Sequence, residues 1–223
     1  MQTTLVSFYS DVDGSTYYSD HHKRIKTNCE ELEIPYDFRK QESLGSYQLN
    51  CLSKPQFILD ILNEKDEPIV WMDIDTVIHK QLNIFDTLSE FDIAFASSNG
   101  MISGAKASPV YVNNTYAGRQ FMNHWIDNTK MVIKQGDELF DHEVLFPLLS
   151  QFSHEGSPIQ IAYLPASYCV WPGETNESTA ITMGLADGES KKNGLRKMGL
   201  QEDHIEWQSP GNKHLNSEGK INI

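Results

Sequence analysis

The sequence is poor in cysteine and contains no long apolar run. Its three cysteines, Cys29, Cys51 and Cys169, are odd in number and widely spaced, which is typical of reduced thiols and not of a disulfide framework or a zinc cluster. No apolar segment approaches the length of a membrane span, and the N-terminus shows no charged-then-apolar signal pattern. We therefore expect a cytoplasmic protein without a membrane span.

Basic residues are also scarce, because 18 Lys and Arg face 31 Asp and Glu, for a formal net charge of −13. Nucleic acids and anionic lipid surfaces attract surfaces rich in Lys and Arg, so the sequence predicts no nucleic-acid partner. With 223 residues, the chain is long enough for one large domain, or one domain and a tail, with a sizeable core.

What the chain does contain is an alternation of strands and helices. Strands are predicted at 3–9, 36–39, 69–73, 92–96, 110–113 and 159–164, and helices at 20–32, behind Ser53, at 117–128 and from about 137–141 onward. This order predicts an α/β fold with a mostly parallel central sheet flanked by helices.

The C-terminal part has a different composition. From Pro172 onward the chain is rich in Gly, Ser, Asn, Glu and Lys and has few apolar residues. We predict a core over residues 1–171 and an irregular extension over residues 172–223, which either closes over the site as a flap or forms a partly mobile tail.

Two aspartates stand one residue apart where the apolar strand that begins at Ile69 should end. A buried charge is costly unless it is paired or bound to a metal, and carboxylates suit Mg²⁺ or Mn²⁺. The carboxyl end of a strand in an open α/β sheet is also where ligands bind. Asp73 and Asp75 are therefore candidate metal ligands, and the alternative is a strand-end turn with solvated aspartates.

The stretch 43–96, SLGSYQLNCLSKPQFILDILNEKDEPIVWMDIDTVIHKQLNIFDTLSEFDIAFA, resembles the core of GT-A glycosyltransferases. In that family a K/R-P-x-F-I helix precedes an apolar strand that ends in D-x-D. YVNNTYAGRQFMNHW at 111–125 and DHEVLF at 141–146 resemble the family's strand-then-helix segment and acidic helix start. The chain departs from the family at 107–109, Ala-Ser-Pro, where many relatives carry Asn-Ser-Gly. It is also similar to small virus-encoded members that glycosylate a capsid.

The resemblance implies a GT-A (Rossmann-like) fold and a metal-dependent hexosyl- or deoxyhexosyltransferase. The donor would be a nucleotide-diphosphate sugar, with UDP the commonest in the family, and the acceptor a glycan or glycoprotein. Asp75 would bind Mn²⁺ or Mg²⁺ directly, and Asp73 would contact the ribose or the metal. His214 is a further candidate metal ligand, since a late histidine reaches the metal in some GT-A enzymes; a solvated tail histidine is the alternative.

Other predicted donor-binding residues surround this pair. Lys54, at a helix start, could meet the diphosphate with help from the N-terminal helix dipole, or be an ordinary solvated lysine. Phe8 and Tyr9, after the first strand, are predicted to line the base pocket and to offer an aromatic ring for stacking. Packing in the core is the alternative for Phe8.

An inverting transfer needs a base for the acceptor hydroxyl. The segment 136–143, GDELFDHE, offers four carboxylates at a predicted helix start, where capping and the helix dipole also favour acidic residues. Asp141 is the candidate catalytic base, because its spacing to Val144 and Leu145 matches the family motif best.

Two other functions remain open. Asp11-Val12-Asp13-Gly14-Ser15 resembles the D-x-D-G-T/S nucleophile loop of haloacid-dehalogenase-type phosphatases, in which Asp11 and Asp13 would act. Against this alternative, Tyr9 and Ser10 separate the apolar strand from that loop. A phosphatase function would also give no role to the segment 71–75, which contains the two aspartates Asp73 and Asp75. A non-catalytic module that binds a sugar or a nucleotide is the third possibility.

Overall fold

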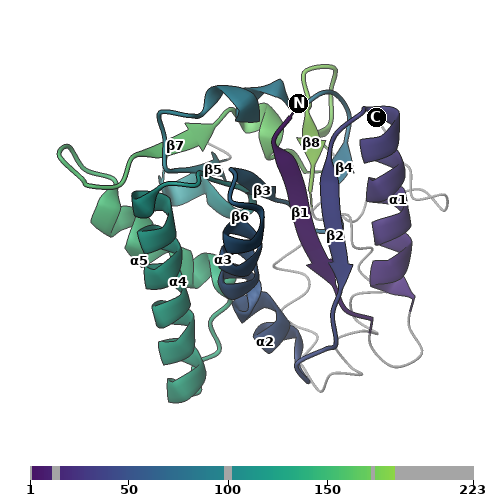
Figure 1. Ribbon diagram of the computed structural model, residues 1–223. Helices are drawn as coiled ribbons and strands as arrows, with labels where there is room; N and C mark the ends of the chain where they lie inside the picture. The colour runs from purple at the N-terminus through teal and green to yellow at the C-terminus, as the bar shows by residue number, and fades with distance from the viewer. Residues whose placement is uncertain (1, 12–15, 98–101, 172–173, 184–223) are drawn as a thin grey trace.

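The computed structural model describes residues 2–11, 16–97, 102–171 and 174–183 of the chain. Its centre is a six-stranded sheet in the order β2-β1-β3-β6-β5-β7 (Figure 1). The strands are β1 (Thr4–Tyr9), β2 (Tyr36–Lys40), β3 (Ile69–Trp71), β5 (Ile93–Ser97), β6 (Ala105–Val112) and β7 (Ile161–Leu164). Strands β2, β1 and β3 are mutually parallel, as are β5 and β7, whereas β6 runs antiparallel to both of its neighbours. The predicted α/β fold with a mostly parallel sheet is confirmed.

Helices cover the two faces of this sheet. The helices are α1 (Tyr17–Glu31), α2 (Tyr47–Leu52), α3 (Lys54–Lys65), α4 (Tyr116–Gln135) and α5 (Asp141–Phe152), and short 3-10 turns lie at Asn83–Thr87, Ile102–Gly104 and Ala166–Tyr168. Figure 1 shows α3, α4 and α5 grouped together and α1 apart from them beside β2. Among the described residues, no helix combines the length and apolarity that a bilayer span needs.

Successive residues of the central strands face opposite layers, so the core has two halves. Val6 and Trp71 pack with α3, α4 and α5, whereas Leu5 and Val70 pack with Ile25 and the other buried residues of the α1 side. This period-two alternation with burial on both faces explains why the run at 69–72 is apolar throughout.

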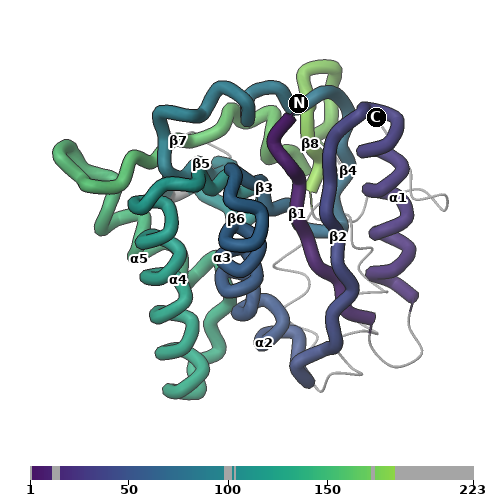
Figure 2. Tube along the Cα trace, viewed as in Figure 1, coloured from purple at the N-terminus to yellow at the C-terminus, as the bar shows by residue number. Residues whose placement is uncertain are grey.

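A small second sheet lies beside the main one. Strand β4 (Val77–Ile78) pairs antiparallel with β8 (Ile181–Thr182), and the two lie side by side in Figure 2. The described segment 174–183 thus returns to the chain just after Asp75. The division of the chain at residues 171 and 172 stays a prediction.

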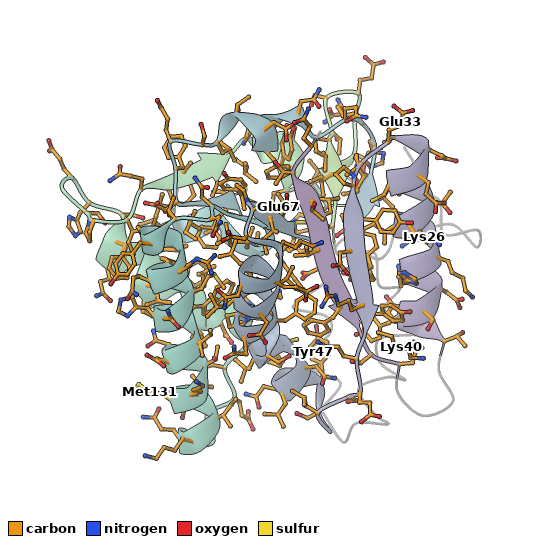
Figure 3. The ribbon with its side chains drawn as sticks, viewed as in Figure 1. Lys26, Glu33, Lys40, Tyr47, Glu67 and Met131 are labelled. Atoms are coloured by element: carbon orange, nitrogen blue, oxygen red, sulfur yellow. The ribbon has the colours of Figure 1, made fainter. Side chains whose placement is uncertain are left out.

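The connections around β1 create a crevice. From β1 the chain passes through α1 to β2 on one side, and from β2 it returns through α2 and α3 to β3 on the other side. In an open α/β sheet, such a reversal of strand order places a ligand site at the carboxyl ends of the two strands, here β1 and β3. In Figure 3, Glu67 marks the opposite end of these strands, and Tyr47 and Lys40 lie toward their carboxyl ends.

The start of α4 packs closely against backbone, and Gly118 makes this approach possible. A Cβ atom there would lie 2.5 Å from the carbonyl oxygen of Asn113 and 3.2 Å from that of Asp92. We expect Gly118→Ala to lower the free energy of unfolding by about 1–3 kcal/mol, the usual cost of overpacking, as measured by urea titration. Asp127→Ala, at an exposed position of the same helix, is the matched control. An unchanged midpoint for Gly118→Ala would show that the helix can shift freely.

Candidate functional site

A pocket of about 560 Å³ opens at the carboxyl ends of β1 and β3, within the size range of small-molecule sites. It brings together six of the seven residues predicted from the sequence, namely Phe8, Tyr9, Lys54, Asp73, Asp75 and Asp141. The seventh, His214, lies outside the described residues. Segments far apart in the sequence therefore meet at the crevice that the strand order creates.

Lys54 is the buried cation of this pocket. Only 6% of the surface of Lys54 is exposed. Its Nζ atom lies 3.0 Å from Oδ1 of Asp73 and contacts Oδ2 of Asp141. The same atom donates a hydrogen bond to the carbonyl oxygen of Ala107 at 3.2 Å. Burial alone would lower the pKa of Lys54, but the carboxylates of Asp141 and Asp73 outweigh it and raise this pKa. Lys54 is thus a charged, internally paired lysine and not a solvated one, and its contact with a donor stays a prediction.

Asp73 is fixed by contacts from three elements. Its Oδ1 accepts a hydrogen bond from the indole Nε1 of Trp71 at 2.8 Å and pairs with Lys54, and its backbone N–H donates to Oγ of Ser108 at 2.8 Å. Burial raises the pKa of Asp73, Lys54 opposes this shift, and the neighbouring carboxylates Asp75 and Asp141 add to it. A second cation near Asp73 would relieve this repulsion.

The two aspartates fit a divalent cation. All side-chain contacts of Asp73 fall on Oδ1, and within the described ranges neither its Oδ2 nor the half-buried Asp75 side chain has a hydrogen bond or salt bridge. The same ranges contain no cluster of three His, Cys, Asp or Glu side chains arranged for a metal. A cation held by one or two carboxylates that takes its other ligands from phosphate and water, as Mg²⁺ often does, needs no such cluster.

Asp141 begins α5 and is 6% exposed. Burial would raise its pKa, but the charge of Lys54 and a contact with His142, whose Nδ1 lies 3.8 Å from Oδ1, lower it to about 2. Of the four carboxylates in the segment 136–143, only Asp141 lines the pocket, and Glu143 instead accepts a hydrogen bond from the backbone N–H of Phe140 as a helix cap. The role of Asp141 as a general base stays a prediction. Its ion pair with Lys54 lowers its pKa and so makes it a weak proton acceptor.

The two aromatic residues at the end of β1 differ in their surroundings. The ring of Phe8 packs against those of Phe57 and Trp71, with centroids 5.1 and 5.3 Å away. Tyr9 stacks on His22 at 4.5 Å with an angle of 15° between the rings. Phe8 therefore belongs to the core as well as to the pocket wall. The stacking of Tyr9 on His22 shows that the pocket wall at the end of β1 accommodates stacked rings.

Asp11, the proposed nucleophile of the phosphatase alternative, anchors α1. Its carboxylate accepts hydrogen bonds from the backbone N–H of Ser19 at 3.0 Å and from the Ser19 hydroxyl, and it pairs with Lys40 at 3.3 Å. Burial would raise the pKa of Asp11, yet these bonds lower it. Asp11 does not line the pocket, and Asp13 lies outside the described residues.

The structure adds pocket residues that the sequence patterns did not single out. Tyr18 and Tyr47 line it from α1 and α2, and Lys106 and Trp171 from β6 and the segment before β8. The Nζ atom of Lys106 lies 5.9 Å from the centre of the Trp171 ring. No short motif surrounds these residues, and only the tertiary fold brings them to the pocket.

Comparison with known proteins connects this chain to solved structures. No protein-family model matches the sequence, and neither does any curated protein. A glycosyltransferase involved in the glycosylation of the major capsid of PBCV-1 matches with a TM-score of 0.62 and 10% identity, over 93% of this chain and 100% of that one. The glycosyltransferase GlyE of Streptococcus pneumoniae TIGR4 matches with a TM-score of 0.56 and 16% identity, over 92% of this chain.

The bifunctional glycosyltransferase WbbM also matches, with a TM-score of 0.51 and 10% identity, over 94% of this chain. This chain spans 63% of the GlyE chain and 52% of the WbbM chain. At these identities the likeness concerns the fold, and it confirms the GT-A-like architecture that the sequence resemblance predicted.

Proposed function

We propose that this chain is a metal-dependent glycosyltransferase that moves a sugar from a nucleotide-diphosphate donor, a UDP-sugar, to a glycan or protein acceptor. The observation that carries the proposal is the pair Asp73 and Asp75 in a pocket at the carboxyl ends of β1 and β3. The solved structures with a similar fold are glycosyltransferases, which supports this reaction and gives no support to a phosphatase.

The chemistry of the pocket suits such a transfer. A divalent cation held by Asp73 and Asp75 would act as a Lewis acid toward the leaving diphosphate. Lys54 and the indole of Trp71 both hold Oδ1 of Asp73, and Ser108 fixes its backbone N–H, so Oδ2, which has no partner among the described residues, is preorganised for a cation. Tyr9, at the β1 side of the pocket, is the ring on which a base would stack.

A thermal-shift panel tests the proposal. The protein is melted with UDP, GDP and their sugar conjugates, each with and without Mn²⁺. We expect UDP compounds to raise the melting temperature only when Mn²⁺ is present. If no nucleotide shifts the transition and the protein instead hydrolyses a generic phosphate ester, the proposal is wrong.

Asp141→Asn tests the predicted general base. Loss of general-base catalysis typically costs about 10²–10⁴-fold in rate. Because a pKa of about 2 makes Asp141 a weak base, we expect transfer, or the slower hydrolysis of the donor, to fall by less than that range. The affinity for UDP with Mn²⁺ should stay near that of the parent. A loss within the full range at unchanged donor affinity would instead assign the base to Asp141.

A further inference from the structure

Lys106 differs from Lys54, the other lysine of the pocket, in having no carboxylate partner among the residues that the structure describes. No Asp or Glu among the described residues lies within salt-bridge distance of Lys106, and its Nζ lies over the ring of Trp171, 5.9 Å from the ring centre. Lys54, by contrast, contacts both Asp73 and Asp141. Lys106 is therefore a half-buried positive charge that an incoming ligand can pair with.

The position of Lys106 in the sheet indicates which part of a donor it would meet. The pocket extends over β1, β3 and β6, which are neighbours in that order. Because β6 runs antiparallel to β3, the first residues of β6 lie at the same end of the strands as the carboxyl end of β3. Lys106 lies two residues before Ser108, whose hydroxyl contacts Asp73, so its Cα is about 7 Å further along the strand.

A nucleotide sugar is linear, with its diphosphate between the base and the sugar. If the diphosphate lies at Asp73 and Asp75 and the base at Tyr9 on the β1 side, the sugar end points toward β6. Lys106 and Trp171 then lie where the transferred sugar and the acceptor meet. The Lys106 ammonium lies over the Trp171 ring, 5.9 Å from its centre, so the two side chains offer a sugar a point charge next to an aromatic surface.

Building on the proposed function, we propose that Lys106 and Trp171 form a subsite for a sugar that carries a carboxylate, a uronic acid. Three carboxylates of the chain, Asp73, Asp75 and Asp141, line the same pocket, so an acidic sugar needs a cation of its own to enter. With a neutral sugar, the Lys106 ammonium would have the Trp171 ring but no carboxylate partner from the described part of the chain, in a partly desolvated site. The uronic acid is either the donor sugar or the terminal residue of the acceptor, since both meet at β6.

Two binding measurements distinguish these sources. In the first, dissociation constants with Mn²⁺ are compared for UDP-glucose and UDP-glucuronate, and for UDP-galactose and UDP-galacturonate. In the second, protein saturated with UDP and Mn²⁺ is titrated with disaccharides that end in glucose or in glucuronate. We expect the acidic sugar to bind about 10- to 100-fold more tightly in one of the two measurements, as a charge-assisted hydrogen bond would give.

Variants of the lysine assign the preference to its charge. Lys106→Met should abolish the preference and leave the affinity for UDP itself unchanged, whereas Lys106→Arg should retain it. Lys130→Met, which removes an exposed lysine of α4 outside the pocket, is the matched control and should behave like the parent. Melting curves identify any variant that fails to fold, in which case Lys106→Arg and Lys106→Gln are compared instead.

Two results would overturn the inference. One is the absence of any preference for an acidic sugar in both measurements. The other is a loss of affinity for UDP itself in Lys106→Met, which would assign Lys106 to the diphosphate. Both leave the proposed function intact, because UDP still binds the parent with Mn²⁺. If the parent bound no UDP compound with Mn²⁺, the proposed function would fail, and this inference with it.

Discussion

Asp75→Asn is expected to abolish the stabilisation that UDP and Mn²⁺ together give the protein. Without a cation between them, a diphosphate and the carboxylates of Asp73 and Asp75 repel one another. A ligand at one hundred times its dissociation constant stabilises a protein by about 2.7 kcal/mol, so its loss is readily seen as a missing shift in melting temperature. Within the described residues Asp75 has no hydrogen bond or salt bridge, so the variant should melt like the parent without ligand.

The control for this prediction is Asp127→Asn, which removes an exposed carboxylate of α4 that does not line the pocket. It should keep the full response to UDP and Mn²⁺. If Asp75→Asn also kept that response, the cation would have to be held elsewhere, and the proposed function would lose the observation on which it depends. A lower melting temperature without ligand would instead assign Asp75 a structural role.

The sequence predicted the framework of the fold because its strands and helices carry strong local patterns. The run at 69–72 is apolar since both of its faces are buried, and α4 shows its stripe of Phe121, Met122, Trp125 and Ile126. Helix α4 nevertheless extends to Gln135, beyond the predicted end at 128. Local periodicity identifies an element better than it locates the ends.

Helix α2 could not be predicted because distant residues stabilise it. The ring of Tyr47 lies 5.7 Å from that of Phe140, and the side chain of Gln48 donates to the carbonyl oxygens of Asp137 and Leu139. The early start of β6 was also missed, since polar Lys106 interrupts the apolar pattern while pairing with Ala96 of β5. In both cases tertiary contacts override local preference.

The pocket was predictable where one segment carries the signal and not where several segments combine. Asp73 and Asp75 stand together in the sequence, so their pattern is visible. The burial of Lys54 depends on Asp73, Asp141 and the carbonyl oxygen of Ala107, which only the fold brings within reach. From the sequence alone, Lys54 at a helix start was therefore equally compatible with an ordinary solvated lysine.

Lys54→Met is expected to be strongly destabilising, by about 3–5 kcal/mol in the free energy of unfolding from urea titration, because it leaves the buried carboxylate of Asp141 and the half-buried one of Asp73 without their cation. Methionine keeps the length of the aliphatic chain, so the effect measures the lost charge, together with its hydrogen bond to the carbonyl oxygen of Ala107, and not a cavity. Adding Asp141→Asn removes one of the two orphaned carboxylates and should recover part of the loss, with a coupling energy of about 0.5–3 kcal/mol.

Lys26→Met is the matched control, since Lys26 is exposed and lies 3.7 Å from Glu30 on the surface of α1. A surface pair of this kind contributes about 0–1 kcal/mol. If Lys54→Met cost no more than this control, the charges around Lys54 would have to be screened by water, and the pocket would be wetter than its burial indicates.

The same variant also reports on the metal. Lys54 lies 3.0 Å from Oδ1 of Asp73, so its charge repels a divalent cation at that carboxylate and meets part of the need for one. Without Lys54, Mn²⁺ becomes the nearest available partner for Asp73. Mn²⁺ should therefore stabilise Lys54→Met more than it stabilises the parent, as measured by the shift in the urea midpoint. Equal stabilisation of the two proteins would place the cation too far from Asp73 for this residue to be a ligand.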